Sequence, residues 1–90
     1  MIITFDPVKS AANIAKHGVS LADAALLYWD RALIRYDDRH DYGETRMVAF
    51  GLIGSRLHIV VFVERNNTYR IISLSKANKR EEAIYAKAQA

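Results

Sequence analysis

The stretch from Leu57 to Lys76 constrains the fold most, because two apolar, β-prone runs are separated there by Asn66 and Asn67. Valine, isoleucine, phenylalanine and tyrosine favour strands, and asparagine tolerates the left-handed backbone that a tight hairpin turn requires. The pattern predicts a buried antiparallel hairpin with a two-residue turn, and a slip of one residue would exchange its two faces. The predicted partners are Val63 with Arg70, Val61 with Ile72, Ile59 with Leu74, and His58 with Ser75.

The composition bounds the size and class of the protein. The chain has 90 residues, of which 51% are hydrophobic and 26% charged, so residues 1–90 are expected to form one compact α+β domain. It contains no cysteine, which removes disulfides and thiolate sites and favours a cytoplasmic protein. No apolar run approaches membrane-spanning length, so no membrane association is expected. The net charge of +3 mildly favours an anionic partner.

Two short helices are expected near the N-terminus. Asp6 is a typical N-cap, Pro7 suits the first helical position, and Gly18 supplies a left-handed stop. Apolar residues recur at helical spacing between these signals, which predicts an amphipathic helix. Ser20, followed three residues later by an aspartate, resembles a capping box and opens a second helix that runs to about Trp29.

Further strands and a C-terminal helix complete the predicted fold. A strand that ends at Gly54 and Ser55 joins the hairpin in a three-stranded antiparallel meander, and a fourth strand can extend it. A polar loop spans residues 37–43, and Asn78 with Glu81 gives the cap of the C-terminal helix. The β-prone segments outside the hairpin are residues 1–5, 32–36 and 45–53.

Following the pairing across the meander brings charged residues to one face of the sheet. If the turn before the hairpin contains two residues, Arg46 lies opposite Val63, which in turn lies opposite Arg70. By the same count Glu44 lies opposite Arg65. The remainder of that face is apolar and is therefore expected to be the side on which the helices pack. Its residues are Val48, Phe50, Leu52, Leu57, Ile59, Val61, Ile72 and Leu74.

One carboxylate among three guanidinium groups suits the chemistry of a phosphodiester. Arginine binds phosphate through two parallel hydrogen bonds and stays charged, and a neighbouring carboxylate can accept a proton from a hydroxyl. The alternative is a surface ion-pair network at the end of a sheet, which is the commoner explanation for such spacing.

Other polar residues give weaker signals. His17 could donate a proton, or bind phosphate together with Lys16, although a cation at a helix C-terminus is the simpler explanation. His58 opposite Ser75 fits a hydrogen-bonded sheet pair. The histidines show no metal-ligand spacing, so we expect no metal and no other cofactor. Tyrosines could stack on RNA bases, but they more often fill half-buried positions; they are Tyr42, Tyr69 and Tyr85.

Three groups of residues resemble the BrnT toxin family. The first follows the pattern DPxKxxxNxxKHGV from Asp6 to Val19, and the last combines the pair Glu64–Arg65 with the RIIS segment at Arg70–Ser73. Because these groups recur in one order at familiar spacings, the resemblance covers nearly the whole chain. The middle group is Glu44, Arg46 and Gly51.

The resemblance implies a type II toxin with a RelE-like fold that acts as a metal-independent ribonuclease and inhibits translation. It also implies neutralisation by a co-encoded BrnA-like antitoxin with a ribbon-helix-helix domain, through which the complex binds operator DNA and represses its own operon. Two positions depart from the family. Lys76 stands where an arginine is usual and so lacks the bidentate fork, and Phe62 stands where a polar residue or histidine is common.

The residues and the resemblance together suggest that an RNA 2′-hydroxyl attacks the neighbouring phosphate. Glu44 is the expected general base, while Arg46, Arg65 and Arg70 hold the phosphate and stabilise the charge that develops. His17 is expected to protonate the leaving group. Glu64 is the second choice as base, and the expected substrate-binding residues are Lys16, Glu64 and Lys76.

Two readings from other classes remain open. The chain can be a binding module, either a toxin relic without catalysis or a partner within a repressor complex, that uses the same arginines for phosphate contacts alone. It can also be a structural domain whose exposed strand edge pairs with another chain.

Overall fold

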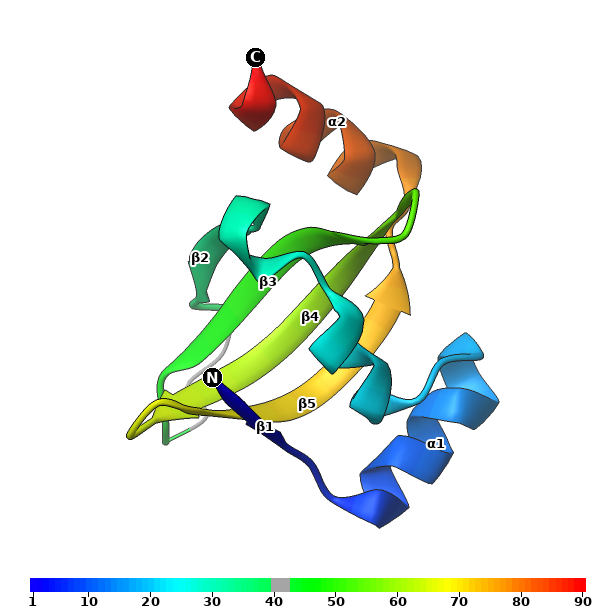
Figure 1. Ribbon diagram of the computed structural model, residues 1–90, viewed down its shortest axis with the longest axis vertical. Helices are drawn as coiled ribbons and strands as arrows, with labels where there is room; N and C mark the ends of the chain where they lie inside the picture. Colours follow the sequence, from blue (N-terminus) through cyan, green and yellow to red (C-terminus); the bar gives the residue numbers. More distant parts are fainter. Residues whose placement is uncertain (40–42) are drawn as a thin grey trace.

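The computed structural model describes residues 1–39 and 43–90, which form a five-stranded mixed sheet with helices around it (Figure 1). This is the α+β class that the sequence predicted. The strand order is β1-β5-β4-β3-β2. The elements are β1 (Ile2–Thr4), α1 (Pro7–His17), the 3-10 helices η1 (Leu21–Leu26) and η2 (Trp29–Arg31), β2 (Leu33–Asp37), β3 (Arg46–Ile53), β4 (Arg56–Arg65), β5 (Thr68–Lys76) and α2 (Lys79–Gln89).

The sheet differs from the predicted antiparallel meander of three to four strands by its first strand. Strands β2 to β5 are antiparallel neighbours in sequence order, but β1 lies beside β5 and pairs with it in parallel, Ile2 with Thr68. A parallel pair requires a long crossover connection, and here the crossover is nearly the whole chain. The β-prone run at the N-terminus therefore closes the sheet at the edge opposite β2.

The prediction of the second N-terminal helix is wrong in the type and the length of the helix. In place of an α-helix to Trp29, the chain forms the 3-10 helix η1, followed by the separate short turn η2. The buried residues Leu21, Ala24 and Leu27 recur every three positions. That period matches the three residues per turn of a 3-10 helix, so this form places all three side chains on the sheet.

Both predicted hairpin turns contain two residues. Asn66 and Asn67 have φ angles of 54° and 64°, as a type I′ turn requires, and Val63 pairs with Arg70 as predicted. The turn between β3 and β4 uses Gly54 at φ 60°, and the strands that flank it pair Ile53 with Arg56.

A β-bulge in β5 overturns the predicted register farther from the turn. Phe62 pairs with Ile71 but Val61 pairs with Ser73, so Ile72 is an extra residue on β5. The bulge exchanges the faces of every later β5 side chain. The observed pairs that replace the predicted ones are Val61 with Ser73, Ile59 with Ser75, and His58 with Lys76.

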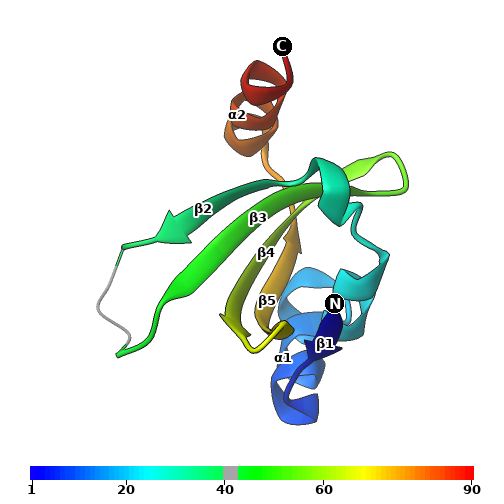
Figure 2. The ribbon, with the colours of Figure 1, turned by 60° about the vertical axis from the view of Figure 1, so that its left-hand side comes forward.

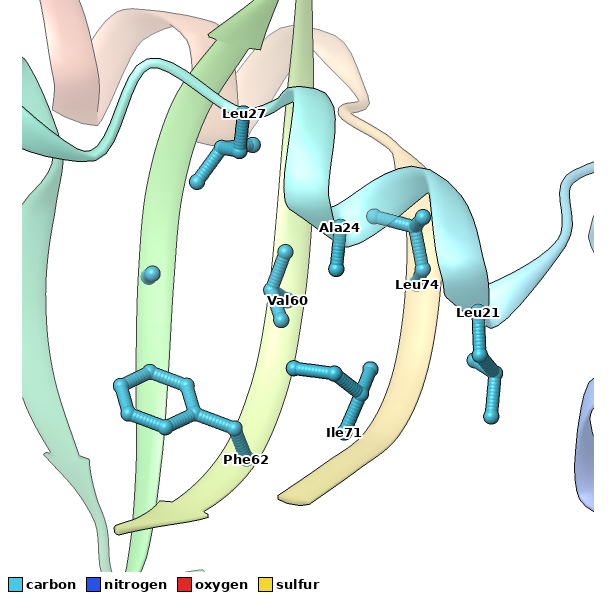
Figure 3. Packing of buried hydrophobic residues seen from close by; sticks show 8 residues of the cluster. Leu21, Ala24, Leu27, Val60, Phe62, Ile71 and Leu74 are labelled. Atoms are coloured by element: carbon cyan, nitrogen blue, oxygen red, sulfur yellow. The ribbon is translucent and has the colours of Figure 1, made fainter. Parts of the chain in front are cut away.

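The main core lies on the face opposite to the one predicted. Figure 3 shows Val60 and Phe62 of β4 beneath the segment that carries Leu21, Ala24 and Leu27, with Ile71 and Leu74 alongside. The bulge brings Leu74 to this face, where it is fully buried. The predicted face is covered only towards one end, by Ile84 and Tyr85 of α2, over a smaller cluster of Phe50, Leu57, Ile59 and Ala77. Figure 2 shows α2 at that end of the sheet, away from α1 and β1.

Helix α1 is fastened to the sheet by the buried side chain of Asn13. Its Nδ2 donates to the carbonyl of Leu74 at 2.7 Å and to that of Val19 at 2.8 Å, while its Oδ1 accepts from the Leu74 amide at 3.2 Å. Strand β1 pairs only with the first part of β5, so Asn13 takes the place of a neighbouring strand at Leu74. The caps follow the prediction, with Asp6 accepting from Val8 and Gly18 at φ 75°.

Candidate functional site

The sheet face that carries Ile59, Val61 and Val63 is covered by a helix only at one end, by α2 (Figure 2), and we call it the open face. These three side chains are themselves only 7 to 8% exposed. Residues that pair across neighbouring strands share a face, so the side chains on the open face form rows across the sheet. The row nearest the Asn66 turn joins Arg65 of β4 to Thr68 of β5. The next row contains Asp37 opposite Arg46, and Val63 opposite Arg70. Charged residues are therefore concentrated at this end of the open face.

A pocket of about 540 Å³ lies at that charged end, and we call it the charged pocket. Glu44 approaches it from the residues before β3, and Arg46 Nε donates to Glu44 Oε1 at 3.3 Å. The side chains of Arg46 and Glu44 are 22% and 36% exposed, so the carboxylate remains accessible to a ligand. The pocket is lined by Thr4, Glu44, Val63, Arg65, Asn66, Thr68 and Arg70. The structure thus brings together the four charged residues that the pairing argument placed on one face.

Asp37 is a site residue that sequence reasoning missed, because it was assigned to a polar loop. It ends β2 opposite Arg46, and its side chain is only 1% exposed. The Arg39 guanidinium donates two hydrogen bonds to this carboxylate, from Nε to Oδ1 at 2.7 Å and from Nη2 to Oδ2 at 2.8 Å. These bonds hold the pKa of the Asp37 carboxyl below its usual value, although burial acts in the opposite direction. The sequence signal that could have revealed this ion pair is an aspartate and an arginine two residues apart, Asp37 and Arg39, directly after a β-prone segment.

A second pocket, of about 370 Å³, continues along the open face, and we call it the central pocket. One row of its lining runs from Arg35 through Val48 and Val61 to Ser73. The next row contains Phe50, Ile59 and Ser75, and the first turn of α2 closes the far side. The remaining lining residues are Tyr36, Asp37, Asp38, Arg39, Asn78, Arg80, Glu81 and Ile84. Without the bulge the two serines would face the core.

Some expected site residues lie away from the charged pocket. His17 is the last residue of α1 and Lys16 is exposed beside it, and neither lines the charged or the central pocket. Lys76 ends β5 opposite the buried His58, whose Nδ1 lies 2.9 Å from the carbonyl of Arg56. The predicted pair of His58 with Ser75 does not form.

Glu64 lies on the other face of β4 from Arg65, because successive residues of a strand alternate. Its partner across the sheet is Tyr69, which stacks on Phe62 with 4.5 Å between ring centroids. Burial, reinforced by the Glu64 carboxylate, raises the pKa of the Tyr69 phenol. Tyr69 thus packs against the main core, and Tyr85 of α2 packs against the smaller cluster. His40 and Tyr42 fall outside the described residues.

Membrane-spanning helices and metal-binding groups of side chains are both absent from residues 1–39 and 43–90. In these ranges no helix is long and apolar enough to span a membrane. Nor do three histidine, aspartate or glutamate side chains gather there in a way that could hold a metal ion.

Comparison with known proteins identifies a family for this chain. The family model described as the ribonuclease toxin, BrnT, of type II toxin–antitoxin systems matches residues 5–81. No curated protein matches the chain significantly. The matched region contains strands β2 to β5, and with them every lining residue of the charged pocket except Thr4. Most of α2 lies beyond it.

Proposed function

The chain belongs to the BrnT family of type II toxin–antitoxin ribonuclease toxins, and on this premise we propose that the charged pocket cleaves RNA by attack of a 2′-hydroxyl on the adjacent phosphate. The observation that carries the proposal is the convergence of Glu44, Arg65 and Arg70 on one pocket. A carboxylate that could accept a proton and two guanidinium groups that could bind phosphate thus lie within the reach of one ligand.

Each group has a separate part in this reaction. Glu44 accepts the proton of the 2′-hydroxyl as the new bond from oxygen to phosphorus forms. Arg65 and Arg70 bind the phosphate oxygens and stabilise the additional negative charge of the transition state. The bond to the 5′-oxygen then breaks, which leaves a cyclic 2′,3′-phosphate and a 5′-hydroxyl.

The proposed mechanism also requires a role for Arg46 and a source for the proton that the leaving 5′-oxygen takes up. The bond from Arg46 to Glu44 supports a role for this arginine in orienting the base. Sequence reasoning assigned protonation of the leaving oxygen to His17. Because the charged pocket is open and His17 is not part of its lining, we assign that proton to solvent.

The wider function follows from membership of the family. We propose that the protein acts in the cytoplasm, where RNA cleavage inhibits translation until a BrnA-like ribbon-helix-helix antitoxin neutralises it. Operator DNA would then be bound through the antitoxin. We also propose metal independence, because two guanidinium groups supply the positive charge for which other nucleases use cations. Cleavage is therefore expected to persist in EDTA, and loss with EDTA followed by recovery with a divalent ion would contradict this.

Glu44→Gln is the decisive variant. It removes the base and keeps the arginines, so cleavage of a short single-stranded RNA should fall roughly 10²- to 10⁴-fold. RNA binding, measured by fluorescence anisotropy at one salt concentration, should be unchanged or tighter. Glu82→Gln, on the exposed side of α2, is the matched control and should cleave at the wild-type rate. Wild-type cleavage by Glu44→Gln would show that Glu44 is not the base.

Arg70 variants test phosphate recognition separately. Arg70→Ala should weaken both binding and cleavage, because the contact acts in the ground state and more strongly in the transition state. Arg70→Lys keeps the charge without the fork and should recover binding better than cleavage. Arg31→Ala removes an exposed arginine of η2 and serves as the control for lost charge. A non-catalytic binding module, which the Glu44–Arg46 ion pair would also suit, predicts no cleavage by wild type and only a small change in affinity for Glu44→Gln.

A further inference from the structure

We infer that the central pocket is a nucleotide-binding subsite, which holds an RNA base next to the scissile phosphate. The inference rests on the proposed function, because it takes the charged pocket as the place where the phosphate is bound. It assigns the chemistry of the subsite to Arg35, Phe50, Ser73 and Ser75, all of which line the central pocket.

The two pockets are adjacent on one strand. Val61 lines the central pocket and Val63 lines the charged pocket, and both side chains point to the open face of β4. Alternate residues on a strand are about 7 Å apart, since each residue advances about 3.4 Å. A single RNA strand that has a phosphate in the charged pocket can therefore place a neighbouring nucleotide in the central pocket.

The central pocket offers a base a planar cation above an apolar floor. Its floor consists of Val48, Phe50, Ile59 and Val61, and the guanidinium carbon of Arg35 lies over the Phe50 ring, 5.9 Å from its centre. Because Phe50 is only 7% exposed, the surface for stacking is the outer side of the guanidinium plane. Unpaired RNA bases stack on aromatic rings and on guanidinium planes. Within the described residues no carboxylate forms a salt bridge with Arg35, so its plane is available to a ligand.

The bulge at Ile72 supplies polar groups on the opposite wall. It turns Ser73 and Ser75 to the open face, and within the described residues neither hydroxyl hydrogen-bonds to another protein group. A hydroxyl can donate one hydrogen bond and accept two, so these serines can pair with the edge of a base or with a ribose hydroxyl. The pocket thus combines stacking on one side with hydrogen bonding on the other.

Among the described residues, positive and negative side chains line the central pocket in equal number, and two of the carboxylates are already engaged within the protein. The charged lining residues are Arg35, Arg39 and Arg80, and Asp37, Asp38 and Glu81. Asp37 is bound by Arg39, and Glu81 accepts from the Asn78 amide at 2.8 Å in the capping box of α2. An acidic polypeptide would meet the same arginines but would not need the stacking surface, so we argue for RNA.

Removal of the stacked base gives the first test. One six-nucleotide RNA is intact, and a second carries abasic riboses on both sides of the scissile phosphate, so that it offers the central pocket no base. Arg35→Ala should lower kcat/KM for the intact RNA about 10-fold and leave the abasic RNA unaffected, because one stacked base is lost. Arg35→Lys should behave like Arg35→Ala, since lysine keeps the charge and loses the plane. Arg31→Ala is the control and should affect neither substrate. Equal losses on both substrates would overturn the inference.

Binding without turnover separates this inference from the proposed function. In the Glu44→Gln background, added Arg35→Lys should weaken binding of the six-nucleotide RNA about 10-fold by anisotropy. That result supports the subsite even if wild type cleaves no RNA, in which case only the proposed function falls. Unchanged affinity in both Arg35 variants would refute the subsite whatever the cleavage assay shows.

An oligoglutamate of the same charge as the RNA tests the protein alternative. It should bind more weakly than the RNA and be insensitive to Arg35→Lys. Tighter binding that depends on Arg35 to the same degree would make an acidic protein segment the occupant and would overturn the inference. Ser73→Ala with Ser75→Ala should reduce affinity for the six-nucleotide RNA about threefold to tenfold, by loss of hydrogen bonds.

Discussion

The two faces of the sheet are built from alternate residues of the same strands, yet they serve different purposes. On β5, Leu74 is fully buried in the main core, and the adjacent Ser73 faces the central pocket. The core face is covered by η1 and held by α1, whereas α2 is the helix that covers the open face, and it does so only at one end. Farther from α2, Val61 and Val63 are still only 8% exposed. The comparison indicates that stability is concentrated on one face and ligand contacts on the other, so substitutions at neighbouring residues should separate the two properties.

Leu74→Ala and Ser73→Ala test this division at neighbouring positions. Leu74→Ala removes a fully buried side chain and should lower the free energy of unfolding by about 2 to 5 kcal/mol. Ser73→Ala removes a hydroxyl that faces a pocket and should stay within about 0.5 kcal/mol of wild type. Urea denaturation followed by circular dichroism measures both. Similar losses for the two variants would show that the faces do not differ in stability.

Gly51→Ala adds a methyl group to the core face, whereas Leu74→Ala removes side-chain volume from it. A Cβ at this position would lie 2.7 Å from Leu27 Cδ2 and 2.8 Å from its Cγ, so Leu27 or the strand must shift. We expect a loss of about 1 to 3 kcal/mol in unfolding free energy. Ser55→Ala, in the exposed turn after β3, is the control and should change stability by less than about 0.5 kcal/mol. A neutral Gly51→Ala would mean that Leu27 repacks freely.

Asn78→Ala examines the one end of the open face that α2 covers. The Asn78 side chain accepts from the Glu81 amide at 2.8 Å, and alanine cannot replace this cap. We expect Asn78→Ala to lower the stability of α2 and its contacts by about 1 kcal/mol and to leave the rest of the fold unchanged. Amide hydrogen exchange should become faster in α2 and remain unchanged in β4 and β5. Equal acceleration in the central strands would show that α2 supports the whole sheet.

The smallest expected effect concerns pH. The pKa of Asp37 is lowered from the ordinary value of 3.8, so its ionised form stabilises the folded state at neutral pH. This contribution is fully present above the unfolded pKa and is lost as pH falls through the folded pKa, below about 4. Asp37→Asn should therefore show a weaker decline in unfolding free energy between pH 5 and pH 2 than wild type. Parallel curves for the two proteins would contradict the assignment.

The charged pocket was predictable because its geometry depends on two short turns. Asn66 and Asn67 adopt positive φ and Gly54 does the same, so pairing counted outward from each turn places Arg46 and Arg70 on one face. Short-range turn chemistry is encoded in neighbouring residues and needs no knowledge of the tertiary fold.

The central pocket was not predictable, because it depends on the bulge. Ile72 and Leu74 are both apolar, and either face of β5 could have accepted them from sequence alone. The choice depends on η1 above and on Asn13, which binds the backbone of Leu74. The register of the second half of β5 is therefore set by residues far away in sequence. The spacing of Leu21, Ala24 and Leu27, in contrast, could have indicated the 3-10 helix.

The parallel pairing of β1 with β5 also fixes the order in which the protein can be completed. Ile2 has no strand partner until Thr68 has been synthesised, whereas the hairpins of β3, β4 and β5 join segments that are close in sequence. Such long-range contacts form slowly and late in folding. Thr4, which pairs with Arg70, supplies one wall of the charged pocket. During synthesis on the ribosome, we therefore expect the nascent chain to form its central hairpins first and to complete this pocket only when most of the polypeptide has emerged.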